Sequence, residues 1–132
     1  MYCTQADLIT RFGEAELIQL TDTTASGEID AAVVAQAIAD AEAEIDAYLT
    51  ARYSLPLASV PANLTRLACD IARYRLYADH PVEPVDVRYR DAIRYLEQVG
   101  RGAIALASSP APDTGGALMA ADTPVFGRDA EW

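Results

Sequence analysis

The sequence predicts an all-α protein: a small helical bundle of about two short and three long helices, followed by a flexible C-terminal tail. Apolar residues recur every three or four positions through most of the chain before Gly102, which is the period of an amphipathic helix. Capping residues, prolines and glycines bound each periodic segment. A chain of 132 residues with 52% hydrophobic content suits one domain, which we place at residues 1–107, with the tail at 108–132.

Two short helices are expected first. Thr4 is placed to cap the first helix, with Asp7 three residues later imitating a capping box and Gly13 ending it. The second covers residues 14–20 and directs its apolar side chains to the core. Those side chains are Leu17, Ile18 and Leu20.

Three long helices follow. The first begins after the N-cap Asp30 and reaches about Arg52, the second starts at Pro61 and reaches about Asp79, and the third opens with Pro84. Gly100 and Gly102 close the last one. The expected buried positions are Val34, Ile38, Ala41, Ile45 and Tyr48 or Leu49, then Leu64, Leu67, Ala68, Ile71 and Ala78, and finally Val85, Tyr89, Ala92, Ile93, Leu96 and Val99.

Charge is distributed unevenly along the chain. All ten basic residues are Arg; the net charge is −9 over residues 1–51, +2 over 52–101 and −3 over 102–132. A chain of net charge −10 is repelled by phosphate, so we expect no specific nucleic-acid binding. This separation of acidic and basic residues along the chain favours ion pairs between the two segments, or between neighbouring subunits, because the planar guanidinium of Arg binds a carboxylate through two N–H groups. The alternative is a set of weak ion pairs on the surface of one monomer.

The acidic residues of the helix at 30–52 need partners. Asp40 and Glu44 lie opposite its apolar stripe, and Glu42 and Asp46 flank the stripe. Like-charged pairs four residues apart weaken an isolated helix, so we expect cationic side chains from elsewhere to form ion pairs with these carboxylates. The alternative is an acidic face exposed to solvent. Arg75 falls on the apolar face of the next helix, where it either pairs with Glu42 or Asp46 or extends to water.

Other features suggest contacts between molecules. Cys69 and Leu76 form a second apolar strip that a neighbouring subunit is expected to cover, and Arg90, Arg94 and Arg101 line a basic ridge. The bulky apolar residues of the tail are either anchors that order on a partner or incidental. The candidate interface comprises Asp40, Glu44, Cys69, Leu76, Arg90, Arg94, Arg101, Phe126 and Trp132.

No pattern indicates catalysis, a metal site or a cofactor. Residues 22–33 overlay a calcium loop, but Val33 stands where the bidentate Glu belongs, so we expect an ordinary loop ending in the Asp30 N-cap. The single histidine, His80, precedes Pro81 and has no nucleophile partner in the sequence. We interpret Cys3 and Cys69 as reduced packing residues. Without a long apolar span or a signal peptide, the chain is expected to stay in the cytosol.

Several short segments together carry a family resemblance. They are LTD at 20–22, AIADA at 37–41, EIDAYL at 44–49, RYSLPL at 52–57 and VP at 60–61, followed by LA at 67–68, IA at 71–72 and RY at 88–89. This combination resembles the Mu-like phage and prophage small head protein family, which was formerly classified as a domain of unknown function. The resemblance covers about residues 2–106 and is densest at 37–61.

The resemblance implies a small helical protein similar to the head-completion or head-tail connector proteins of tailed phages. Such proteins form a ring beneath the portal through which DNA passes, so the expected partners are a portal protein, a tail-completion or stopper protein and further copies of the chain. The expected location is the head-tail interface of the virion, after assembly in the host cytoplasm, and no enzymatic residues come with the family. The alternatives are a small helical adaptor and an acidic regulator that mimics DNA.

Overall fold

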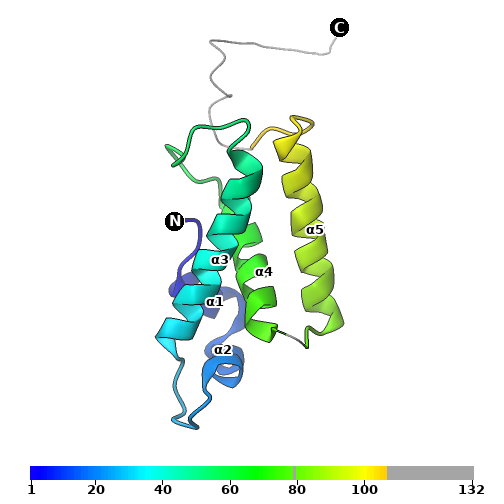
Figure 1. The fold of residues 1–132 in the computed structure, drawn as a ribbon. Coiled ribbons are helices and arrows are strands. Elements are labelled where there is room, and N and C mark those ends of the chain that lie inside the picture. Colours follow the sequence, from blue (N-terminus) through cyan, green and yellow to red (C-terminus); the bar gives the residue numbers. More distant parts are fainter. Residues whose placement is uncertain (79, 107–132) are drawn as a thin grey trace, which may run out of the picture.

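Five helices form the part of the chain described by a computed structural model, residues 1–78 and 80–106, in which no strand occurs. They are α1 (Gln5–Phe12), α2 (Glu14–Thr21), α3 (Ala31–Leu49), α4 (Ala62–Tyr77) and α5 (Glu83–Gly100). The long helices α3, α4 and α5 pack on one another, and the short pair α1 and α2 packs against α4, with α1 also contacting α3 (Figure 1). The all-α prediction is confirmed.

Local sequence signals explain where the helices begin. The Thr4 side chain accepts a hydrogen bond from the Asp7 N–H while the Asp7 carboxylate accepts one from the Thr4 N–H, which is the predicted capping box. Asp30 caps α3 by accepting from the N–H groups of Ala32 and Val33. Each cap satisfies backbone donors that a helix end otherwise leaves unpaired.

Two helix ends differ from the sequence prediction. Helix α3 ends at Leu49 rather than near Arg52, and α4 ends at Tyr77. Ala78, which was expected in the core, is exposed and has a φ of 54°. The chain leaves α4 there because the position before Pro81 disfavours helical geometry, so the helix cannot continue through His80.

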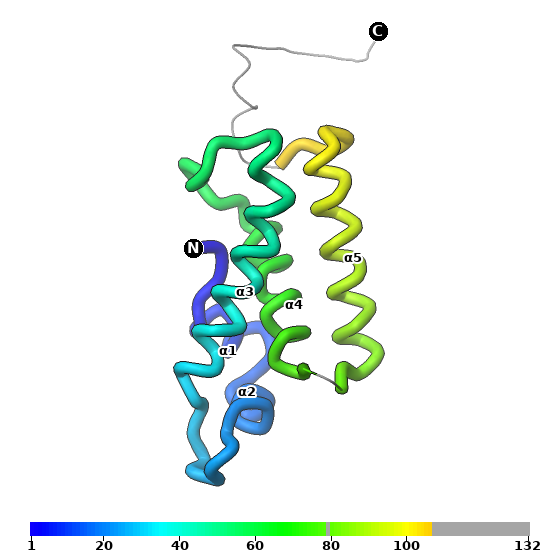
Figure 2. Tube along the Cα trace, in the orientation of Figure 1, coloured from blue at the N-terminus to red at the C-terminus, as the bar shows by residue number. Residues whose placement is uncertain are grey.

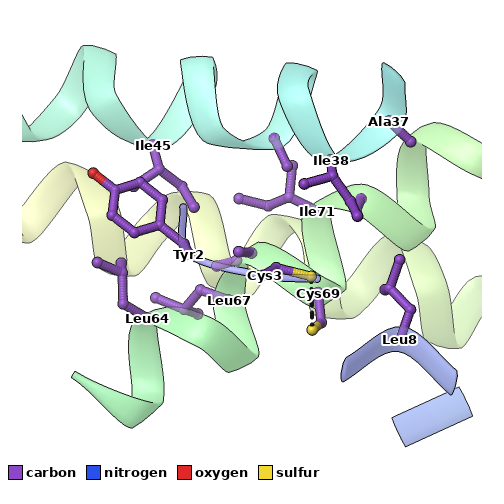
Figure 3. Close-up of a cluster of buried hydrophobic side chains, with 14 of the residues drawn as sticks. Tyr2, Cys3, Leu8, Ala37, Ile38, Ile45, Leu64, Leu67, Cys69 and Ile71 are labelled. Atoms are coloured by element: carbon purple, nitrogen blue, oxygen red, sulfur yellow. Dashed lines mark hydrogen bonds between the residues drawn. The ribbon is translucent and has the colours of Figure 1, made fainter. Parts of the chain in front are cut away.

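The core lies where α3, α4 and α5 meet. The stripe predicted for α3 is buried, and Leu64, Leu67 and Ile71 of α4 face it (Figure 3). The loop at 50–61 lies at the same end of the bundle as the end of α5 (Figure 2). There the Tyr53 hydroxyl accepts a hydrogen bond of 3.1 Å from the N–H of Leu106, itself a buried residue. This contact closes that end of the core.

The second apolar strip of α4 is covered within the chain. Cys69 is fully buried and Leu76 is 9% exposed, so neither offers a surface to a neighbouring subunit. The segment that holds Cys3 lies over Cys69, and α1 and α2 pack on the same helix (Figure 3). This corrects the expectation of an intermolecular cover: the two short helices supply the second layer that α4 needs.

Candidate interaction surfaces

Glu44 joins three helices. Its Oε1 accepts a hydrogen bond of 2.6 Å from Arg75 Nη2 on α4, and its Oε2 accepts one of 2.7 Å from the Tyr89 hydroxyl on α5. The Tyr89 ring stacks on Tyr74 with ring centroids 3.8 Å apart. Burial and the hydrogen bond to Glu44 raise the pKa of Tyr89 to about 12. The cluster therefore fastens α3 to both other long helices.

This arrangement corrects the sequence interpretation of the acidic helix. Arg75 is paired, but with Glu44 rather than with Glu42 or Asp46. Because α5 packs on α3 as well as on α4, the side of α3 that carries Glu44 faces the bundle rather than a neighbour. Asp40 is exposed and accepts a hydrogen bond of 2.9 Å from Gln36 Nε2 on the same helix.

Glu42 and Asp46 hold the N-terminal segment. Glu42 Oε2 accepts a hydrogen bond of 2.8 Å from the Tyr2 N–H, and Asp46 accepts one from the Tyr2 hydroxyl. Burial, followed by the hydrogen bond to Asp46, raises the pKa of Tyr2. Nothing in the local sequence around residue 2 indicates these contacts, since they join positions 40 and 44 residues apart.

A second Arg of α4 ties down the short helices. Arg73 forms a two-point contact with Glu16 of α2, with Nε at 2.6 Å and Nη2 at 3.0 Å from the carboxylate oxygens. Its guanidinium also lies 4.3 Å from the centre of the Phe12 ring. Together with the Arg75–Glu44 pair, this contact shows that part of the charge complementarity between the acidic and the Arg-rich segments lies within one chain.

The basic ridge of α5 is exposed. Arg90 and Arg94 have side chains that are 64% and 67% exposed. Within the part of the chain that the structure describes, each pairs only with an Asp of the same helix, Asp86 and Asp91 respectively. Arg101, just beyond α5, is exposed, and no ion pair to it occurs among residues 1–78 and 80–106. Such pairs leave guanidinium donors available, because Arg carries five N–H groups. The exposure of these three Arg side chains agrees with the outer face predicted from the sequence, whereas their role in an interface stays a prediction.

Asp70 of α4 is almost fully buried. Its carboxylate oxygens stand 3.6 Å from Arg66 and 3.7 Å from Arg88, whose side chains are largely exposed. Burial raises the pKa of Asp70, although the neighbouring Arg88 and Arg66 oppose that shift. The sequence did not single out this residue, because an Asp in a helix with several Arg neighbours is usually solvated.

Two grooves run beside the N-terminal segment. One, of about 160 Å³, lies between α1 and α3 and is mainly apolar, with Gln5, Ala35, Ile38 and Ala39 in its walls. The other, of about 330 Å³, lies between the segment and the loop at 50–61. Met1 and Glu42 line both grooves. Walls of the second groove are Tyr2, Asp46, Leu55, Pro56, Leu57 and Val60. It therefore combines carboxylates with apolar side chains.

The loop that resembles a calcium site is organised by its own backbone. The Asp22 carboxylate accepts hydrogen bonds from the N–H groups of Thr24, Ser26 and Gly27, and the Gly27 bond, the largest cause, lowers the pKa of Asp22. Among the described residues, no group of three potential metal-binding side chains occurs. None of the described helices is long and apolar enough to cross a membrane. Phe126 and Trp132 lie outside the described residues.

The fold and its surfaces define a small all-α protein whose distinguishing features are charged faces and grooves. The chain belongs to the Bacteriophage Mu Gp36 family, whose model matches residues 2–121. It is 46% identical over 102 residues to gene product J of Escherichia phage Mu, covering 76% of this chain and 72% of that protein. It is 38% identical over 133 residues to the Mu-like prophage FluMu protein gp36 of Haemophilus influenzae, covering 98% of this chain and 94% of that protein.

Proposed function

We propose that this protein is a structural subunit of virion assembly, a head-completion or head-tail connector protein that forms a ring beneath the portal. Membership in a Mu phage family supports a role in the phage particle or its assembly. The proposed partners are the portal protein, a tail-completion or stopper protein and further copies of the chain, and the role is structural rather than catalytic. DNA passes through the ring without specific binding, as suits a chain of net charge −10.

The observation that carries the proposal is the separation of a basic and an acidic surface. The ridge of Arg90, Arg94 and Arg101 belongs to α5 and its end, whereas Asp40 and the acidic edge of the larger groove belong to α3. A ring needs a heterologous interface, in which one surface of each subunit meets a different surface of the next. The ridge of one subunit against the acid-edged groove of its neighbour meets this requirement and adds electrostatic complementarity.

The test is a charge reversal on the ridge. Arg101→Glu removes a basic side chain for which the described residues show no ion pair, so it should weaken assembly more than folding. Arg11→Glu is the matched control, because Arg11 is also exposed and also at the C-terminal end of a helix, but on α1. Each variant is mixed with portal protein and the assemblies are counted by electron microscopy, with stability checked by urea unfolding.

The proposal expects Arg101→Glu to reduce the fraction of portals carrying this protein at least several-fold, and Arg11→Glu to leave it unchanged. Equal assembly by both variants, with stability intact, would remove the ridge from the interface. If the unmodified protein neither forms rings nor binds portal under any ionic strength, the connector role itself is wrong.

A further inference from the structure

The two cysteines of the chain meet in the core although they lie 66 positions apart. The Cys3 and Cys69 sulfur atoms are 3.1 Å from each other, and their side chains point together from the N-terminal segment and from α4 (Figure 3). Both thiols are free and buried. No other thiol competes for the pairing, because the protein has only these two cysteines.

We propose that Cys3 and Cys69 are a modification site, at which a low-molecular-weight disulfide oxidises the thiol pair to an intramolecular disulfide that fastens the N-terminal segment to α4. A disulfide bond measures about 2.04 Å, so the sulfur atoms must approach by only about 1 Å. Residues 1–4 lie outside any helix, so this shift does not require a helix to be broken.

The exchange proceeds in two balanced steps. The Cys69 thiolate attacks one sulfur of the small disulfide, forming a mixed disulfide and releasing one thiolate, which takes up a proton. The Cys3 sulfur, having lost its proton, then attacks the Cys69 sulfur and expels the second small thiol. In sum, two cysteine thiols lose two electrons and two protons, and the small disulfide leaves as two thiols.

The surroundings favour Cys69 as the first thiolate. The hydrogen bond that Cys3 shares with Cys69, together with burial, raises the pKa of the Cys3 thiol. The same hydrogen bond with Cys3 lowers the pKa of the Cys69 thiol, and the positive charge of Arg11 adds to this, while burial and the carboxylates of Asp7 and Asp70 oppose it. Because both sulfurs are buried, the reagent gains access when residues 1–4 open locally, which requires release of the Tyr2 contacts to α3.

Oxidation would also fix the walls of the two grooves. Met1 lines both grooves and Tyr2 lines the larger one, and each lies within two residues of Cys3. In the reduced protein the segment is held by non-covalent contacts alone, whereas a covalent link to α4 would prevent its opening. This inference concerns the thiol pair and does not depend on the proposed function.

The test uses the full chain and bis(2-hydroxyethyl) disulfide, an uncharged reagent chosen because the protein carries a net charge of −10. The protein is incubated folded, and separately refolded from urea with the reagent present, so that access is not limiting. Remaining thiols are then alkylated under denaturing conditions and peptides are mapped by mass spectrometry. Cys3→Ala and Cys69→Ala are the controls, since each keeps one thiol.

The expected product is a monomer in which peptides containing residues 3 and 69 are cross-linked, with both thiols lost. Its Tm should be about 10 °C above that of the reduced protein, and a reductant should reverse the rise. Each control should give only a mixed disulfide. The proposal is wrong if the wild-type protein refolded with the reagent keeps two alkylatable thiols. It is equally wrong if that protein gives mixed disulfides alone or intermolecular dimers.

Discussion

Arg75 donates a hydrogen bond of 2.6 Å to Glu44, although the two residues lie 31 positions apart on α4 and α3. The same carboxylate accepts a hydrogen bond from Tyr89, so one side chain holds three helices together. Exposed ion pairs contribute little to stability, but Glu44 is only 20% exposed and is shared between two donors. The pair is therefore expected to matter for folding rather than for assembly.

Replacing Glu44 tests this role. Glu44→Ala should lower the free energy of unfolding by about 1–2 kcal/mol, because it leaves Arg75 and Tyr89 without their acceptor, while the partial exposure of Arg75 limits the loss. Asp40→Ala, an exposed acid on the same helix, should change it by less than about 0.5 kcal/mol. Urea unfolding compares the two. Equal effects would mean that Glu44 is no better anchored than a surface acid.

Stability should fall at alkaline pH. Because the folded protein raises the pKa of Tyr89 to about 12 while an unfolded tyrosine titrates near 10, its contribution is complete below about pH 10 and is lost as the pH rises toward 12. Unfolding curves between pH 8 and 12 measure this loss. In the Tyr89→Phe variant the free energy of unfolding should fall less steeply with pH, because one titrating group is removed. An equally steep fall would assign the pH dependence to other tyrosines, such as Tyr2.

Asp70 should be replaceable without loss of stability at neutral pH. Its folded pKa is raised, so its contribution is present below the unfolded value of about 3.9 and lost as the pH rises through the folded value. Asp70→Asn keeps the shape and removes the buried charge, so stability at pH 7 should stay within about 1 kcal/mol of wild type or rise. A loss of about 3 kcal/mol would show instead that the Arg66 and Arg88 pairs outweigh the cost of burial.

The turn after α5 depends on Gly102. Its φ is 84°, and a Cβ built there would lie 2.5 Å from Arg52 Cζ. Gly102→Ala should therefore destabilise the protein by about 1–2 kcal/mol, from backbone strain and displacement of Arg52. Gly13→Ala is the matched control, since Gly13 has a φ of 93° and open space around it, and should show the strain alone. Gly102→Ala is also measured in an Arg52→Ala background. If it lowers the free energy of unfolding there by as much as in the wild-type protein, the contact with Arg52 does not contribute.

The tail can be tested by deletion. The helices and the core described above consist of residues from 1 to 106, so removing residues 109–132 should leave helical content and Tm nearly unchanged. If Phe126 and Trp132 are anchors, the shortened chain should lose binding to the portal or to the next tail protein. Circular dichroism and a portal pull-down measure the two effects. Normal assembly of the shortened chain would make the anchor hypothesis wrong.

The sequence by itself determined the helices and most of their ends. The Thr4 and Asp30 caps, the apolar period of α3 and the glycines at the end of α5 act within a few residues, so they can be recognised without the fold. The exposed ridge at Arg90 and Arg94 was predictable for the same reason, because side chains spaced by four residues share a helix face.

Only the tertiary structure decided which residues meet across the bundle. The sequence offered both Glu42 and Asp46 as partners for Arg75. The packing of α4 on α3 instead places Glu44 next to Arg75, while Glu42 and Asp46 accept hydrogen bonds from Tyr2. Likewise the spacing of Cys3 and Cys69 carried no signal, yet the N-terminal segment brings the two sulfurs together and covers the apolar strip of α4. Helix periodicity determines which side of a helix is apolar, whereas helix packing geometry determines its partner.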